Sequence, residues 1–150
     1  MDLILWRHAD AEDGADDAAR ALTRKGLKQA ARMGAWLDAR LPKGARMIVS
    51  PAVRAQQTAK ALQRDAHTSD RVNTGAHPRD ILEAAGWPGG SGTIVVVGHQ
   101  PTLGAAAALA LTGKAAQWHF KKGAIWWISA EEGESAPTVV AVMTPDLVAD

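Results

Sequence analysis

Three short runs of apolar residues constrain the fold of this chain more than any other feature of its sequence. They lie at residues 2–6, 47–49 and 93–97, and four of the five residues in the last run are β-branched aliphatics. Continuous apolar runs of this length, stopped by polar or turn residues, are typical of strands buried on both faces of a sheet. Residues 124–129 and 138–143 have a similar character and predict two further strands.

Helical patterns separate most of these runs. Thr23 is a good N-cap residue, and apolar residues recur after it at three- and four-residue spacing as far as Arg40. Further helices are predicted at residues 51–64, 78–85 and 101–111, and loops at residues 9–21 and 65–77. This alternation predicts an α/β fold, namely a three-layer α/β/α sandwich with a mostly parallel central sheet. We expect one domain over residues 1–150.

The composition narrows the class of protein. The chain has 150 residues, and its 17 Lys and Arg against 16 Asp and Glu leave a net charge of +1, which excludes a generally basic nucleic-acid-binding protein. It has no Cys, which excludes disulfide bonds, thiolate metal sites and a cysteine nucleophile. Its longest apolar stretch, Leu103 to Leu111, is about half the length that crosses a bilayer. We therefore expect a cytoplasmic monomer whose partners include neither nucleic acid nor a membrane.

Basic and imidazole side chains follow three of the predicted strands. The first strand ends at Arg7 and His8. Arg54 follows the second strand, and His99 follows the third. Because the carboxyl ends of parallel strands meet at one edge of a sheet, where ligands bind, we expect these four side chains to converge. An arginine presents donors that match phosphate oxygens two at a time, so the sequence predicts a site for a phosphate dianion.

The same four residue types fit the chemistry of phosphoryl transfer. The transition state spreads negative charge over three equatorial oxygens, which fixed positive donors stabilise. A neutral imidazole can attack the phosphorus near physiological pH, and a second imidazole can donate to the oxygens. We expect no metal ion or other cofactor, because the arginines neutralise the charge and no His and carboxylate pair recurs at the spacing of zinc ligands.

These residues belong to four motifs whose order and spacing resemble those of a known family. The motifs are Leu5-Trp6-Arg7-His8-Ala9-Asp10-Ala11, Leu22-Thr23-x-x-Gly26, Val49-Ser50-Pro51-x-x-Arg54-Ala55-x-x-Thr58-Ala59 and Val96-Val97-Gly98-His99-Gln100-Pro101-Thr102. Over residues 3–129 the chain resembles the histidine phosphatase superfamily, and within it the short branch of phosphohistidine phosphatases that act on bacterial histidine phosphotransfer domains. The resemblance implies a phosphoglycerate mutase-like fold. It also implies metal-independent hydrolysis of phosphohistidine through a phosphorylated His8, with Arg7, Arg54 and His99 forming the phosphate pocket.

The chain departs from the family pattern in two places. Ala9 replaces a glycine that could serve a left-handed backbone conformation or a close approach of the phosphate. No motif places the carboxylate that protonates the leaving group in larger relatives. The candidates are Asp10, Glu12, Asp17, Asp80 and Glu83. A phosphorylated imidazole leaves more easily than an alkoxide, so a site without a dedicated acid favours phosphohistidine over sugar phosphates.

Two other functions fit the same residues. One is a small-molecule phosphomonoesterase of the same superfamily, and the other is a module that binds phosphohistidine without turnover. The partner is accordingly a phosphorylated protein, such as a histidine phosphotransfer domain, or a small phosphorylated molecule. 

The aromatic residues outside the motifs carry two further expectations. Trp126 and Trp127 should place one ring on each face of the sheet, because successive side chains of a strand alternate. Trp87 and Trp118 lie in predicted loops and could form a rim on which a protein partner docks. His67, His77 and His119 lack regular spacing, and we assign them to the surface or to packing.

Overall fold

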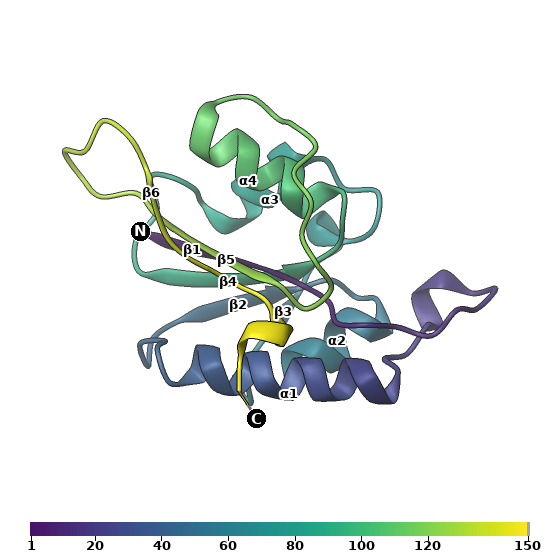
Figure 1. The fold of residues 1–150 in the computed structure, drawn as a ribbon. Helices are drawn as coiled ribbons and strands as arrows, with labels where there is room; N and C mark the ends of the chain where they lie inside the picture. Colours follow the sequence, from purple (N-terminus) through teal and green to yellow (C-terminus); the bar gives the residue numbers. More distant parts are fainter. Residues whose placement is uncertain (150) are drawn as a thin grey trace.

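A six-stranded sheet forms the centre of the protein (Figure 1), whose computed structural model describes residues 1–149. The strands are β1 (Asp2–Arg7), β2 (Arg46–Val49), β3 (His67–Thr68), β4 (Thr93–Gly98), β5 (Ile125–Ser129) and β6 (Thr138–Met143). Their order in the sheet is β3-β2-β4-β1-β5-β6. The first four strands in this order are parallel to one another, whereas β5 runs antiparallel to β1 and β6 antiparallel to β5.

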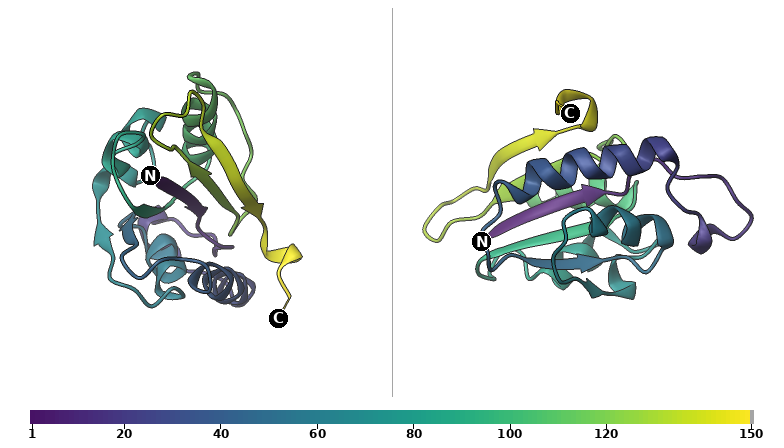
Figure 2. Two further views of the ribbon diagram at one scale, coloured as in Figure 1. Left: turned by 90° about the vertical axis from the view of Figure 1, so that its left-hand side faces the viewer. Right: turned by 90° about the horizontal axis from the view of Figure 1, so that it is seen from below.

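Four α-helices of the described residues, 1–149, cover the two faces of this sheet. They are α1 (Arg24–Asp38), α2 (Val53–Lys60), α3 (Pro78–Ala85) and α4 (Thr102–Thr112). The first two lie on one face and the last two on the other, as Figures 1 and 2 show. The three-layer α/β/α sandwich predicted from the sequence is therefore confirmed.

The apolar run of β1 is continuous because both faces of the strand are buried. Leu3 and Leu5 pack in the cluster beneath α3 and α4, and Ile4 and Trp6 pack in the cluster beneath α1 and α2. All four side chains are completely buried. Burial of each Leu or Ile stabilises the fold by about 1.5–3 kcal/mol before the entropy of ordering is counted.

The register of the parallel strands brings their carboxyl ends together. Arg7 of β1 lies opposite Gly98 of β4, and Val49 of β2 lies opposite Val97 of β4. Beyond the strands, the amide of His8 still donates to the carbonyl of Gly98 (3.1 Å), and the amide of Ser50 donates to the carbonyl of Val97 (3.1 Å). The segments that leave β1, β2 and β4 are thus hydrogen-bonded side by side at one edge of the sheet.

Three predictions about the elements were wrong in detail. The helix expected at 51–64 is shorter, because α2 begins at Val53 and ends at Lys60. The loop predicted at 9–21 contains a 3-10 turn (Asp17–Ala19), and the loop predicted at 65–77 contains β3 and a second 3-10 turn (Asp70–Val72). These elements have only two or three residues, which is too few to produce a recognisable period.

Tryptophans outside the motifs pack against the hydrophobic clusters on the two faces of the sheet. Trp126 and Trp127 belong to the clusters on opposite faces of the sheet, which confirms that prediction. Trp87 and Trp118 are half-buried against the cluster beneath α3 and α4, and the Trp118 ring lies 5.6 Å from that of Trp126. Core packing accounts for both of these rings, and the docking role suggested for them stays a prediction.

Within residues 1–149, no helix combines the length and the apolar character needed to span a membrane.

Candidate active site

His8 leaves the end of β1 with its imidazole held in one orientation. Its Nδ1 lies 2.8 Å from the carbonyl oxygen of Ala9, which only accepts hydrogen bonds, so Nδ1 carries the proton. Its Nε2 accepts a hydrogen bond of 3.3 Å from Nε of Arg54. The residue is 8% exposed. Nε2 of His8 is therefore the unprotonated nitrogen, and its electron pair points to a guanidinium group.

The surroundings of His8 keep it neutral. Burial lowers its pKa to about 4 from the ordinary value of 6.5, the hydrogen bond to Ala9 opposes this shift, and the charges of Arg54 and Arg7 add to it. At neutral pH the imidazole is consequently unprotonated at Nε2, which is the form in which a histidine can act as a nucleophile.

His99 follows β4 and lies beside His8, with the two ring centroids 5.2 Å apart. Its Nε2 is 2.7 Å from the hydroxyl oxygen of Ser50. That hydroxyl donates its one hydrogen to Oδ1 of Asn73 (3.3 Å), so Nε2 of His99 is the donor to Ser50. Burial lowers the pKa of His99 to about 3, and the charges on His8 and Arg54 lower it further. The ring of His99 is thus fixed by a hydroxyl group on the strand-end segment after β2.

The side chain of Arg7 is held by the segment between α4 and β5. Its Nη1 donates to the carbonyl of Phe120 at 2.6 Å, in the segment that leads to β5. Burial lowers its pKa.

Two buried nitrogens of these side chains have no hydrogen-bond partner within the part of the chain that the structure describes. They are Nε of Arg7 and Nδ1 of His99. A buried polar group that is left unpaired costs about 1–3 kcal/mol, so such groups are rare and mark sites where an ion or a ligand supplies the partner. Arg7 and His99 are two of the four residues that the sequence predicted to bind a phosphate.

Arg54 lies in the first turn of α2 and is 3% exposed. The backbone around it is tied to the segment after β1, because the hydroxyl of Thr58 donates to the carbonyl of Arg54 (2.8 Å) and accepts from the amide of Ala9 (3.0 Å). This pair of hydrogen bonds explains why the motif that contains Arg54 also contains a threonine one helical turn later.

Ala9 fits its position without strain. Gln63 is the one residue other than glycine with a positive φ within residues 1–149, so Ala9 does not need the left-handed conformation that favours glycine. Its side chain is fully buried against Leu22 and Ala30. The close approach in this region occurs instead at Gly26, where a Cβ atom would overlap the carbonyl oxygen of Asp10. The glycine of the second motif therefore lets α1 pack against the backbone that follows His8.

Only one of the five candidate acids contacts a predicted site residue among the described contacts. Asp17 accepts a hydrogen bond of 3.1 Å from Nη2 of Arg54. Asp10 accepts from Lys122 and Thr23, which hold its pKa below the ordinary value. Glu12 is exposed. 

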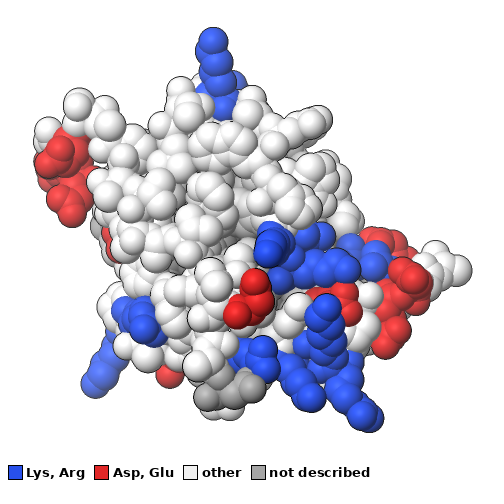
Figure 3. Space-filling model, viewed as in Figure 1, with Lys and Arg blue, Asp and Glu red and all other residues white. Residues whose placement is uncertain are grey.

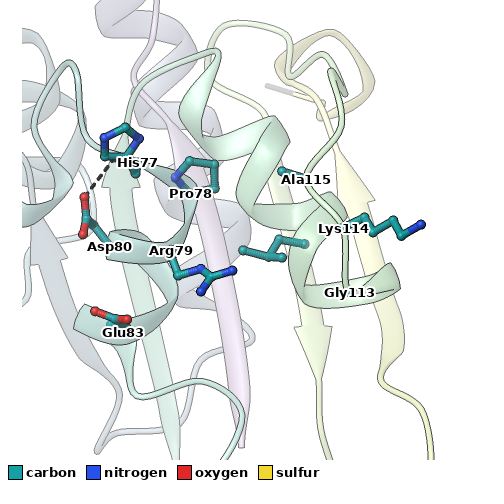
Figure 4. A pocket seen from close by; sticks show the side chains of 9 residues that line it. His77, Pro78, Arg79, Asp80, Glu83, Gly113, Lys114 and Ala115 are labelled. Carbon is teal, nitrogen blue, oxygen red and sulfur yellow. Dashed lines mark hydrogen bonds between the residues drawn. The ribbon is translucent and has the colours of Figure 1, made fainter.

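The remaining two candidate acids lie on α3. Asp80 accepts from the amide of His77, and Glu83 accepts from Arg71. Figure 4 shows Asp80 and Glu83 at a cavity of about 590 Å³ between α3 and the end of α4. The residues that line this cavity include none of the four predicted site residues.

The expectation that no metal ion is needed stays a prediction. Over residues 1–149, the structure contains no group of three or more His, Cys, Asp or Glu side chains that could hold a metal ion.

Two supporting residues of the site have no role assigned from the sequence. The hydroxyl of Ser50 contacts His99 and accepts from the amide of Ala52 in the turn before α2. The hydroxyl of Thr58 joins the backbone of Arg54 to that of Ala9. Both residues stand in the third motif, which was the available signal.

The sequence is similar to that of one known family and to several of its members. The profile of the histidine phosphatase superfamily (branch 1) matches residues 3–79. An uncharacterised protein of Mycobacterium tuberculosis is 36% identical over 106 residues, which cover 67% of this chain and 66% of the length of that relative. The phosphohistidine phosphatase SixA of Escherichia coli is 39% identical over 59 residues, which cover 39% of this chain and 37% of that enzyme.

Solved structures extend the similarity to almost the whole chain. The protein histidine phosphatase SixA, in complex with tungstate, superimposes with a TM-score of 0.83 and 25% identity, covering 97% of this chain and 98% of the other. A protein of Nakamurella multipartitia that is proposed to be the phosphohistidine phosphatase SixA superimposes with a TM-score of 0.79 and 28% identity, covering 96% of this chain and 95% of the other.

Proposed function

This chain belongs to the histidine phosphatase superfamily, and we propose that it is a phosphatase that hydrolyses phosphohistidine on a protein. The observation that carries the proposal is the arrangement around His8. A buried imidazole, unprotonated at Nε2, lies beside the guanidinium group of Arg54 and the ring of His99. Nε of Arg7 and Nδ1 of His99 have no hydrogen-bond partner within residues 1–149. A phosphoryl group between the two imidazoles would supply an oxygen for Nε of Arg7, and its negative charge favours a protonated His99, whose Nδ1 then donates to a second oxygen.

In the proposed reaction, Nε2 of His8 attacks the phosphorus and the P–N bond to the substrate imidazole breaks. The substrate imidazole leaves with its electron pair and takes a proton from solvent. Water then attacks the phosphorus of phospho-His8, which releases inorganic phosphate and restores the neutral ring. Arg7, Arg54 and a protonated His99 donate to the equatorial oxygens in both steps, where charge develops.

The contacts of the carboxylates support phosphohistidine as the substrate. Asp10, Asp80 and Glu83 are each engaged by other partners, and none of those partners is a predicted site residue. An alkoxide leaving group needs a general acid, which is worth about 10²- to 10⁴-fold in rate, whereas a leaving imidazole is protonated easily. We further infer a single-domain monomer over residues 1–150 that needs no metal ion, with a histidine phosphotransfer domain as its partner.

The test is phosphate release from a histidine-phosphorylated phosphotransfer domain in excess EDTA. We expect multiple turnovers by the wild type and none by His8→Ala, with His119→Ala as the matched control because His119 is exposed. Rates on a sugar phosphate should be far lower than those on the phosphoprotein.

Two results would count against the proposal. Equal rates on the sugar phosphate would favour the small-molecule esterase. Stoichiometric binding of the phosphoprotein without release of phosphate would favour the binding module.

A further inference from the structure

The guanidinium group of Arg54 is already occupied by protein oxygens. Its Nη1 donates to the carbonyl oxygen of Asp17 (2.7 Å) and its Nη2 to a carboxylate oxygen of the same residue (3.1 Å). Its Nε donates to His8. The two oxygens of Asp17 thus take the edge of the guanidinium with which an arginine binds phosphate oxygens two at a time.

This occupation contrasts with the rest of the pocket, where Nε of Arg7 and Nδ1 of His99 have no partner within residues 1–149. At those two nitrogens, a phosphoryl group has no hydrogen-bonded protein oxygen to displace among the described residues. A phosphoryl group that also binds Arg54 competes with the carboxylate of Asp17, because a carboxylate and a phosphate dianion on the same guanidinium repel each other.

The position of Asp17 allows its side chain to move away from Arg54. The residue begins the 3-10 turn Asp17–Ala19, in which no residue is buried, and its side chain is 56% exposed. Figures 1 and 2 show the segment between β1 and α1 projecting from the sandwich. The base of this segment is closed by a bridge between Ala11 and Leu22, so its tip can shift without disturbing the core.

The charges around the segment are mixed. Figure 3 shows Lys and Arg side chains gathered at the end of the molecule where this segment lies, with Asp and Glu side chains beside them. Asp17 itself also accepts a hydrogen bond from Arg20 (3.0 Å). Hydrogen bonds from Arg20 and Arg54 hold the pKa of Asp17 below its ordinary value, so the carboxylate is ionised at neutral pH. An ionised carboxylate cannot donate a proton, but it can compete with an anion.

We propose that Asp17 determines the specificity of the site by competing with the phosphoryl group for Arg54. In the free protein its oxygens occupy the guanidinium. A phosphoryl group carried on a protein brings further contacts that offset the displacement, whereas inorganic phosphate does not. The carboxylate therefore weakens the binding of the product and leaves the site available to the phosphoprotein. This inference rests on the proposed function, because it assigns Arg54 to the phosphoryl group.

The test is the affinity for inorganic phosphate, measured by calorimetry at pH 7.5. Asp17→Asn removes the competing charge, and we expect phosphate to bind about 10-fold more tightly, the effect of one charge-assisted pair. The matched control is Asp16→Asn, which makes the same change of charge one residue earlier, where the side chain caps no helix. We expect its affinity to stay within about twofold of the wild type, because exposed charges interact weakly.

A second variant and a second readout make the result decisive. Asp17→Ala should shift the affinity in the same direction as Asp17→Asn. In both variants, phosphate should inhibit hydrolysis of the phosphoprotein at lower concentrations than in the wild type.

Three outcomes would overturn the inference: weaker or unchanged binding by the Asp17 variants, equal tightening by Asp16→Asn, or no phosphate binding by any variant. Because phosphate binding is measured without turnover, loss of the proposed function on phosphohistidine would be seen separately in the release assay.

Discussion

The candidate site joins two regions that differ in how firmly they are held. His8, Arg54 and His99 follow the ends of parallel strands, and they are 8%, 3% and 4% exposed. Asp17 reaches the same site from an exposed 3-10 turn on the segment after β1. From this difference we infer a division of roles: the sheet fixes the groups of the proposed reaction, and the exposed segment carries the carboxylate that we propose competes with bound anions.

The first prediction tests whether Arg54 acts through the planar geometry of its guanidinium group or only through its charge. Arg54→Lys keeps the positive charge and loses the planar set of donors, so we expect kcat/KM for the phosphoprotein to fall by roughly 10²- to 10³-fold. The matched control is Arg64→Lys, because Arg64 is paired with Asp38 away from the site. A loss smaller than tenfold, with the fold intact by circular dichroism, would show that charge alone suffices at this position.

The second prediction concerns the effect of the buried His8 and His99 on the pH dependence of stability. The pKa values of His8 and His99 are lowered to about 4 and about 3, so between those values and 6.5 the unfolded state binds more protons than the native state. The free energy of unfolding should therefore decrease as the pH falls, by roughly 2 kcal/mol per histidine between pH 7 and pH 5.

Denaturant titrations at the two pH values measure this change. His8→Ala should lose less stability on acidification than the wild type, and the exposed His119→Ala should behave like the wild type. An identical pH dependence in all three proteins would contradict the account.

The third prediction concerns the support of His99. Ser50→Ala removes the hydroxyl that lies 2.7 Å from Nε2 of His99, so the ring loses the group that orients it. We expect kcat/KM to fall by about 10-fold, as for other residues that orient a reactive group through one hydrogen bond. Because a purely structural effect would lower stability alone, the informative readout is the pH profile of kcat/KM, which should shift in Ser50→Ala and return in Ser50→Thr.

The sequence predicted the fixed region better than the exposed one, for physical reasons. His8 and His99 each follow a long apolar run, and parallel strands necessarily end at the same edge of the sheet, so their convergence followed from topology. The contact between Asp17 and Arg54 joins residues 37 positions apart through a segment with no period, and no local pattern encodes it. Ser50 shows the same limit, because a hydroxyl before a helix is typical of a cap whether or not it also supports a histidine.

The structure explains why Ala9 can replace the glycine of the family motif. A glycine can be required for its conformation or for the space that it leaves, and the sequence does not distinguish these. Here the backbone at residue 9 is not left-handed, and the space is needed at Gly26.

The most direct test of the central claim is to look for the phosphoryl group on His8 during turnover. The protein would be mixed with ³²P-labelled phosphohistidine on a phosphotransfer domain, quenched with base within the first turnover, and digested for mass spectrometry. The account predicts a base-stable, acid-labile label on the peptide that contains His8, and no label in His8→Ala. Phosphate release at an undiminished rate by His8→Ala, or a label on another residue in the wild type, would contradict it.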